Sequence, residues 1–118
     1  MPDVRAAIVR FNDAINRRDL TAIASMLTED TVLENSNPSP DGRSFRGKPE
    51  VMAFWEQWLA ANPDAHFELE EVIPAGQRCT TRWIYRKMRD GAPWHLRGVD
   101  VFTLRDGKIA AKLTYVKG

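Results

Sequence analysis

One acidic residue in the C-terminal part of the chain has a setting suited to proton transfer. Residues 93–104 alternate between two kinds of side chain, and the even positions are Trp94, Leu96, Gly98, Asp100, Phe102 and Leu104. Alternate residues of a strand face the same side, so Asp100 falls on the more apolar face. A carboxylate there must be ion-paired, hydrogen-bonded or kept neutral. The last two states suit a residue that donates or accepts a proton, whereas pairing with a cation such as Lys112 would make it structural.

Two polar residues follow the first predicted strand, at 31–33, and one of them is a second candidate. Only one of Glu34 and Asn35 can face inward, since successive strand residues point to opposite sides. Glu34 facing inward would be a candidate general base. Asn35 facing inward would supply a hydrogen-bonding amide that does not titrate near neutral pH. The sequence alone leaves the two open.

Large aromatic side chains accompany these polar residues. Trp83 and Tyr85 share one face of a predicted strand at 78–88, and Trp55 and Trp58 share one stripe of a predicted helix. Aromatic residues with a polar tip suit the wall of a ligand cavity, although each could equally be part of the core.

Several other classes of site are not indicated. His66 and His95 lie in different strands without acidic or Cys partners at ligand spacing, so we expect no metal site and no cofactor. Glycine-rich phosphate loops and nucleophile motifs are absent from the sequence. With 17 basic and 16 acidic residues the net charge is +1, which does not favour nucleic acid. No apolar run is long enough to span a bilayer, so we expect no membrane partner.

The elements that must position these residues begin with helices. Apolar residues on one stripe predict a helix over 3–17, and Asp19 can cap a shorter helix whose apolar face includes Leu20, Ile23, Ala24 and Leu27. A polar loop follows at 36–44, and Pro49 opens a third helix that ends at Asn62-Pro63.

The period then changes to two, which predicts strands at 66–73, 78–88, 93–104 and 108–117. Turns at Gly76, Asp90-Gly91 and Asp106-Gly107 make three hairpins in series. Helices first and a sheet second is the α+β order, with the helices on one face of the sheet. The single cysteine, Cys79, and an N-terminus without basic and apolar leader segments favour a cytoplasmic protein.

The order of elements and three segments together resemble the SnoaL-like branch of the NTF2-like superfamily, which includes ketosteroid isomerases, polyketide cyclases, limonene epoxide hydrolases and scytalone dehydratase. The segments are Asp30-Thr31-Val32, Phe45-Arg46-Gly47-Lys48 and the run from Gly98 to Ile109. The resemblance covers essentially all of residues 1–118 and implies a single SnoaL-like domain. It also implies an NTF2-like cone, in which three N-terminal helices pack on a strongly curved antiparallel sheet around an apolar cavity, commonly in a homodimer.

Set against ketosteroid isomerase, Asp100 falls on the oxyanion-hole aspartic acid, which acts as a protonated hydrogen-bond donor. The other catalytic positions of that enzyme carry different residue types here. Its catalytic base falls on Asn35, its oxyanion-hole tyrosine on Phe11 and the tyrosine that supports it on Trp55. An amide cannot shuttle a proton as a carboxylate does, so steroid isomerisation by that mechanism is not expected.

Epoxide hydrolase chemistry is not expected either. Its water-activating set would need acids near positions 81–83 and 114, where the chain has Thr81, Arg82, Trp83 and Thr114. A SnoaL-type cyclase uses an aspartate as acid–base, and Asp100 can fill that role.

Three functions remain. The first is a cofactor-independent isomerase, cyclase or dehydratase, with Asp100 as the acid and Asn35 orienting the substrate. The second is a non-catalytic protein that binds a small ligand, and the third is an association module. The ligand of the first two is a small apolar organic molecule, for example of polyketide, terpenoid or steroid type. The predicted cavity lining is Phe11, Asn35, Trp55, Trp83, Tyr85, Leu96, Asp100, Phe102 and Tyr115. We also expect a homodimer through the outer sheet face, which carries Arg82, Arg86, His95 and Arg97.

Overall fold

The computed structural model describes residues 3–118, which form three helices and six strands. The helices are α1 (Val4–Arg17), α2 (Leu20–Ser25) and α3 (Lys48–Ala61). The strands are β1 (Leu27–Glu34), β2 (Ser44–Arg46), β3 (His66–Ala75), β4 (Arg78–Arg89), β5 (Ala92–Arg105) and β6 (Lys108–Val116). The α+β order expected from the sequence is therefore confirmed.

The first two helices begin at side-chain caps. Asp3 accepts a hydrogen bond from the backbone N–H of Ala6 at 3.1 Å, and Asp19 accepts one from Ala22 at 3.0 Å. Such caps satisfy backbone donors that have no partner inside the helix. The prediction that Leu27 belongs to the second helix is wrong, because the helix ends at Ser25 and Leu27 is the buried first residue of β1.

Strands β3 to β6 form the predicted series of hairpins within one sheet of order β2-β1-β6-β5-β4-β3. The turns at Asp90-Gly91 and Asp106-Gly107 have positive φ at both residues (53° and 77°, 54° and 77°). Two residues with positive φ make the tight turn that matches the twist of paired strands, and Asp-Gly is a favoured pair for it. The limits of these four strands differ from those predicted by at most two residues at each end, whereas β1 begins four residues before the strand predicted at 31–33.

Two features of the sheet differ from expectation. The sheet is not wholly antiparallel, because β1 runs parallel to β6. Residues 44–46, expected in a loop and the approach to α3, form β2, which pairs with Val32, Leu33 and Glu34 of β1. A parallel pair needs a long crossover, and here the crossover is the whole segment from β2 to β5. Short-range sequence patterns carry no signal for so distant a pairing.

A β-bulge sets the register between β5 and β6. Leu104 pairs with Ile109, but Thr103 pairs with Ala111, so Ala110 is left without a partner. From there on Asp100 lies opposite Thr114 and Phe102 lies opposite Lys112. A shift of one residue moves every side chain of a strand to the other face. The bulge therefore decides which β6 residues face the helices.

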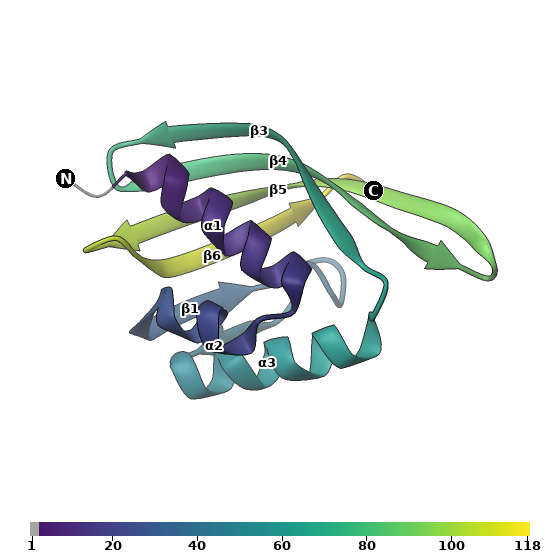
Figure 1. Ribbon diagram of the computed structural model, residues 1–118, viewed down its shortest axis with the longest axis horizontal. Helices are drawn as coiled ribbons and strands as arrows, with labels where there is room; N and C mark the ends of the chain where they lie inside the picture. The colour runs from purple at the N-terminus through teal and green to yellow at the C-terminus, as the bar shows by residue number, and fades with distance from the viewer. Residues whose placement is uncertain (1–2) are drawn as a thin grey trace.

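The helices cover the concave face of the curved sheet (Figure 1). Helix α1 contacts β3 and β4, α3 contacts β1 and β2, and α2 lies between α1 and α3. The long β4–β5 hairpin projects beyond the other strands (Figure 1). The core is buried between the layers and includes Ile8, Ile23, Val51 and Leu104, each at most 2% exposed.

Candidate functional site

Asp100 is buried on the concave face, as the alternation of β5 predicts, and is 6% exposed. Its Oδ1 accepts a hydrogen bond of 2.7 Å from the Thr114 hydroxyl on the neighbouring strand. The same oxygen lies 3.4 Å from Nζ of Lys112. The carboxyl thus has the cation partner that the sequence allowed.

Lys112 is itself largely buried, with a side chain only 15% exposed. Its Nζ donates a hydrogen bond of 2.9 Å to Thr114 Oγ1 and lies 5.5 Å from the centre of the Trp55 ring. Lysine is rarely buried unless its charge is paired, and the face of a tryptophan adds a favourable electrostatic contact. Asp100, Thr114 and Lys112 therefore form one connected polar group in an apolar wall.

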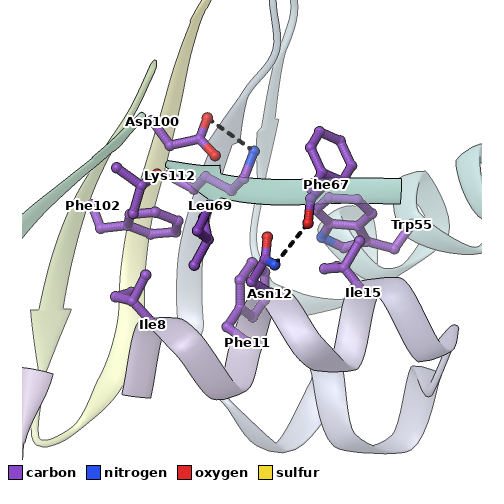
Figure 2. Close-up of a pocket in the computed structure, with 11 residues that line it drawn as sticks. Ile8, Phe11, Asn12, Ile15, Trp55, Phe67, Leu69, Asp100, Phe102 and Lys112 are labelled. Carbon is purple, nitrogen blue, oxygen red and sulfur yellow. Dashed lines mark hydrogen bonds and ion pairs between the residues drawn. The ribbon is translucent and has the colours of Figure 1, made fainter. Parts of the chain in front are cut away.

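A small cavity lies beside Asp100, between α1 and the sheet (Figure 2). Its volume is about 20 Å³, which is enough for one water molecule and too small for an organic ligand. Phe11, Trp55, Asp100 and Phe102, all predicted site residues, line this deep cavity. The Phe11 ring meets Trp55 and Phe102 edge-on, at centroid distances of 6.2 and 6.1 Å. Phe11 and Phe102 are therefore packing residues of the cavity floor.

A larger chamber lies beyond Lys112 and Trp55, with a volume of about 160 Å³. A cavity of about 150 Å³ in another protein accommodates benzene, so this chamber has room for about one aromatic ring. It shares Trp55, Phe67 and Lys112 with the deep cavity. The full lining is Leu33, Asn35, Ser36, Asn37, Phe54, Trp55, Trp58, Phe67, Trp83, Tyr85, Leu96, Lys112, Thr114 and Val116. Apart from Tyr115, the predicted site residues are thus divided between two compartments, with the polar group at their boundary.

Aromatic side chains form most of the chamber wall. Phe67 stacks on Tyr85 and on Trp58, with centroid distances of 4.9 and 5.6 Å. The Tyr85 hydroxyl donates to Asn62 Oδ1 at 3.2 Å, and burial raises the pKa of this phenol. Tyr85 is therefore held as a neutral wall residue at physiological pH.

Asn35, and not Glu34, is the residue that lines the chamber. Its side-chain oxygen accepts a hydrogen bond from the backbone N–H of Arg43 at 2.9 Å, and its backbone N–H donates to the Arg43 carbonyl at 3.0 Å. Asn35 thus fixes the loop that leads to β2 at the chamber mouth. An open groove along α3 continues from this mouth and shares Asn35, Asn37, Phe54 and Trp58 with the chamber.

The prediction that Tyr115 lines the cavity is wrong. Tyr115 pairs with Val99 on the outer sheet face and is 58% exposed. Without the bulge at Ala110, the turn at Asp106-Gly107 would have placed Tyr115 opposite the inward-facing Gly98. The one-residue shift places Lys112 and Thr114 inward instead.

Gly98 gives Trp83 its place in the chamber wall. A Cβ atom on Gly98 would lie 2.4 Å from Cη2 of Trp83 and 2.8 Å from the Tyr115 carbonyl oxygen. The indole therefore lies directly on the β5 backbone, which requires a residue without a side chain. The Trp55 and Trp83 indole nitrogens and the Thr81 hydroxyl have no hydrogen-bond partner among the described residues. Unpaired buried polar groups are uncommon in a purely structural core.

Sequence reasoning misses several residues of the site. The sequence suggests Lys112 only as a structural partner of Asp100, and Thr114 only as a departure from epoxide hydrolase. It does not single out Phe67 or Asn12, although Asn12 donates to the Phe67 carbonyl at 3.1 Å and so attaches α1 to β3 (Figure 2). The alternation of 66–73 places Phe67 with Leu69 on one face, a signal that could have found it.

Within residues 3–118, no group of three or more His, Cys, Asp or Glu side chains could hold a metal ion. Over the same residues, no helix has the length and apolar character needed to cross a membrane.

Comparison with known proteins agrees with this architecture. The family model of the SnoaL-like domain matches residues 8–112. An NTF2-like protein of unknown function from Mesorhizobium loti is 36% identical, with a TM-score of 0.84 over 100% of this chain and 98% of that one. A search of curated proteins found no match.

More distant structures share the fold. TerC, co-crystallised with polyporic acid, is 19% identical, with a TM-score of 0.80 over 95% of this chain and 89% of that one. A hypothetical protein with a ketosteroid isomerase-like fold from Catenulispora acidiphila, in complex with trimethylamine, is 14% identical, with a TM-score of 0.78 over 92% of this chain and 83% of that one. The family match and the fold together show that the chain belongs to the SnoaL-like family of the NTF2-like superfamily.

Proposed function

We propose that the protein is a cofactor-independent enzyme that transfers protons on a small, mostly apolar organic substrate, as an isomerase, cyclase or dehydratase does. The observation that carries this proposal is the position of Asp100. It is a buried carboxyl that lines the deep cavity, and its neighbours Thr114 and Lys112, which line the aromatic chamber, connect it to the chamber wall. Buried acids in apolar pockets are the usual candidates for acid–base catalysis.

In this proposal Asp100 begins the reaction as a carboxylate, with the Lys112 ammonium beside it and the Thr114 hydroxyl as its hydrogen-bond donor. It takes a proton from a carbon acid and then, as the acid, returns that proton to another atom of the substrate. Only Oδ1 is engaged by the described residues, which leaves Oδ2 available for the proton. Asn35 would orient the substrate at the chamber mouth, since its amide cannot act as a second acid.

Deuterium exchange tests this proposal even though the substrate is unidentified. A panel of aromatic and polycyclic ketones is incubated with the protein in heavy water, and mass spectrometry follows exchange at carbon. We expect the wild type to accelerate exchange of at least one compound and Asp100→Asn to lose that acceleration by about 100-fold or more. Asp106→Asn, at an exposed turn position, is the matched control and should retain it.

The residue type at Asn35 favours a second function, ligand binding. Asn35 occupies the position of the catalytic base of ketosteroid isomerase, and its side chain fixes the loop at the chamber mouth. In that alternative the chamber binds a ligand without turnover. TerC with polyporic acid and the Catenulispora protein with trimethylamine are members of the same fold found with small molecules. Binding of a panel compound without exchange, in both the wild type and Asp100→Asn, would favour this alternative. If no compound binds, an association module is the remaining function.

We further propose a homodimer through the outer sheet face. Arg82, Arg86 and Arg97 on this face are ion-paired with Glu71, Glu68 and Glu70 respectively, so the face is close to neutral. Tyr115 is an exposed aromatic residue beside them, in a shallow hollow with Arg82 and Arg97. A neutral face with an exposed aromatic residue suits association with a second copy. Light scattering at micromolar concentration that gives a mass of 13.4 kDa would contradict this proposal.

A further inference from the structure

Lys112 is engaged less firmly than its burial would suggest. Its 3.4 Å distance to Asp100 Oδ1 is longer than the roughly 2.7–2.9 Å typical of a charge-assisted hydrogen bond. Its one hydrogen bond within the described residues, at 2.9 Å, goes to the neutral Thr114 hydroxyl. An ammonium group has three N–H donors. The lysine therefore retains donor capacity that residues 3–118 do not use.

Thr114 satisfies Asp100 independently of the lysine. Its hydroxyl donates to Asp100 Oδ1 at 2.7 Å, so the carboxylate keeps a short hydrogen bond when Lys112 engages another group. Lys112 can thus engage a second anionic partner while Asp100 keeps its hydrogen bond from Thr114. A lysine needed solely to neutralise Asp100 would be expected to contact it at hydrogen-bond distance.

The surroundings of Lys112 favour such a partner on the chamber side. Lys112 is the one basic residue among the described residues that line the chamber. Those around it are largely aromatic, and an apolar wall strengthens the attraction between the ammonium and an anion. The chamber has room for about one aromatic ring, at about 160 Å³.

We infer that Lys112 is the ligand-anchoring residue of the chamber and binds an anionic oxygen attached to an aromatic ring, as in a phenolate. The inference rests on the proposed ligand-binding function and adds the class of the ligand. The ring lies among Trp58, Phe67 and Tyr85, and its oxygen meets Lys112 at the boundary with Asp100. The remainder of a larger ligand extends past Asn35 into the groove along α3.

A pair of probes that differ only by a methyl group and a charge at the oxygen tests the inference. 4-Nitrophenol, at a pH where it is mainly phenolate, is compared with its neutral methyl ether, 4-nitroanisole. Dissociation constants are measured by calorimetry for the wild type and Lys112→Met, which keeps the length of the side chain and removes its charge. We expect Lys112→Met to weaken phenolate binding by about tenfold or more and to change nitroanisole binding by less than about twofold.

Asp100→Asn provides the opposite test. Since it removes the carboxylate that competes for Lys112, it should tighten phenolate binding and leave nitroanisole binding unchanged. The double variant Lys112→Met with Asp100→Asn carries no charge at either position, and it replaces the single variant if Lys112→Met does not fold. We expect it to bind the phenolate as weakly as Lys112→Met does.

The outcomes separate the inference from the proposed function. Phenolate binding that is unchanged in a folded Lys112→Met protein, or weakened by Asp100→Asn, overturns the role of Lys112. If nitroanisole binds while the phenolate has no dependence on Lys112, the chamber is a ligand site and the inference alone fails. If neither probe binds to the wild type, the chamber is not a site for aromatic ligands and both fail.

Discussion

The two faces of the sheet carry ion pairs of very different character. On the outer face, Arg82, Arg86 and Arg97 meet glutamates with both side chains in contact with solvent. On the concave face, Lys112 and Asp100 are paired with only 15% and 9% of their side chains exposed. Exposed pairs contribute little to stability, and buried pairs are costly to desolvate. A pair that is costly for the fold is therefore better explained by what it does in the chamber than by stability.

The largest loss of stability should follow from removing only one charge of the buried Asp100–Lys112 pair. Lys112→Met leaves Asp100 buried with Thr114 as its remaining hydrogen-bond donor, and we expect a loss of about 3–5 kcal/mol in the free energy of unfolding. Urea denaturation measures it. The double variant with Asp100→Asn should recover most of that loss, since two neutral groups need no counter-charge. A double variant no more stable than Lys112→Met would contradict this account of the pair.

An intermediate effect is expected at Gly98. In Gly98→Ala the new Cβ overlaps the Trp83 ring and the Tyr115 carbonyl, so we expect a loss of about 1–3 kcal/mol and a narrower chamber. Combining it with Trp83→Phe removes the overlapping ring atoms but not the carbonyl contact, so that double variant should cost less than the sum of the two single variants. Strict additivity in urea denaturation would show that the indole does not lie on the strand as described.

The smallest loss of stability should follow from breaking an ion pair on the outer sheet face. Arg97 lies 3.2 Å from Glu70, with 47% and 24% of the two side chains exposed, and Arg97→Ala should cost less than about 1 kcal/mol. Urea denaturation at several protein concentrations measures this cost. If the face is a dimer interface, the effect of the variant should depend on protein concentration, because the unfolding of a dimer does. A large loss in the free energy of unfolding that does not depend on protein concentration would contradict the claim that ion pairs on the outer face contribute less to stability than the buried pair.

Much of the fold was predictable because its signals are local. Asp3 and Asp19 cap the first helices, and Asp-Gly pairs mark two of the hairpin turns. The parallel pairing of β1 with β6 was not predicted, since it joins segments about 80 residues apart and depends on the completed sheet.

The residues of the candidate site on β4 and β5 were predicted, whereas those on β6 were missed. Asp100, Trp83 and Leu96 face inward because the alternation of β4 and β5 is regular on both sides of their turn. The bulge at Ala110 has no clear signature in the sequence, yet it turns Tyr115 outward and Lys112 inward. Strand alternation alone therefore could not show whether a cation lies beside Asp100.

A crystal structure with 4-nitrophenol bound tests the role of Lys112 in the chamber most directly, because it locates the ligand and its oxygen together. We predict the ring among Trp58, Phe67 and Tyr85, with its oxygen within hydrogen-bonding distance of Lys112 Nζ and with Asp100 still bonded to Thr114. A probe bound on the outer face beside Tyr115, or in the chamber with its oxygen directed away from Lys112, would contradict that role.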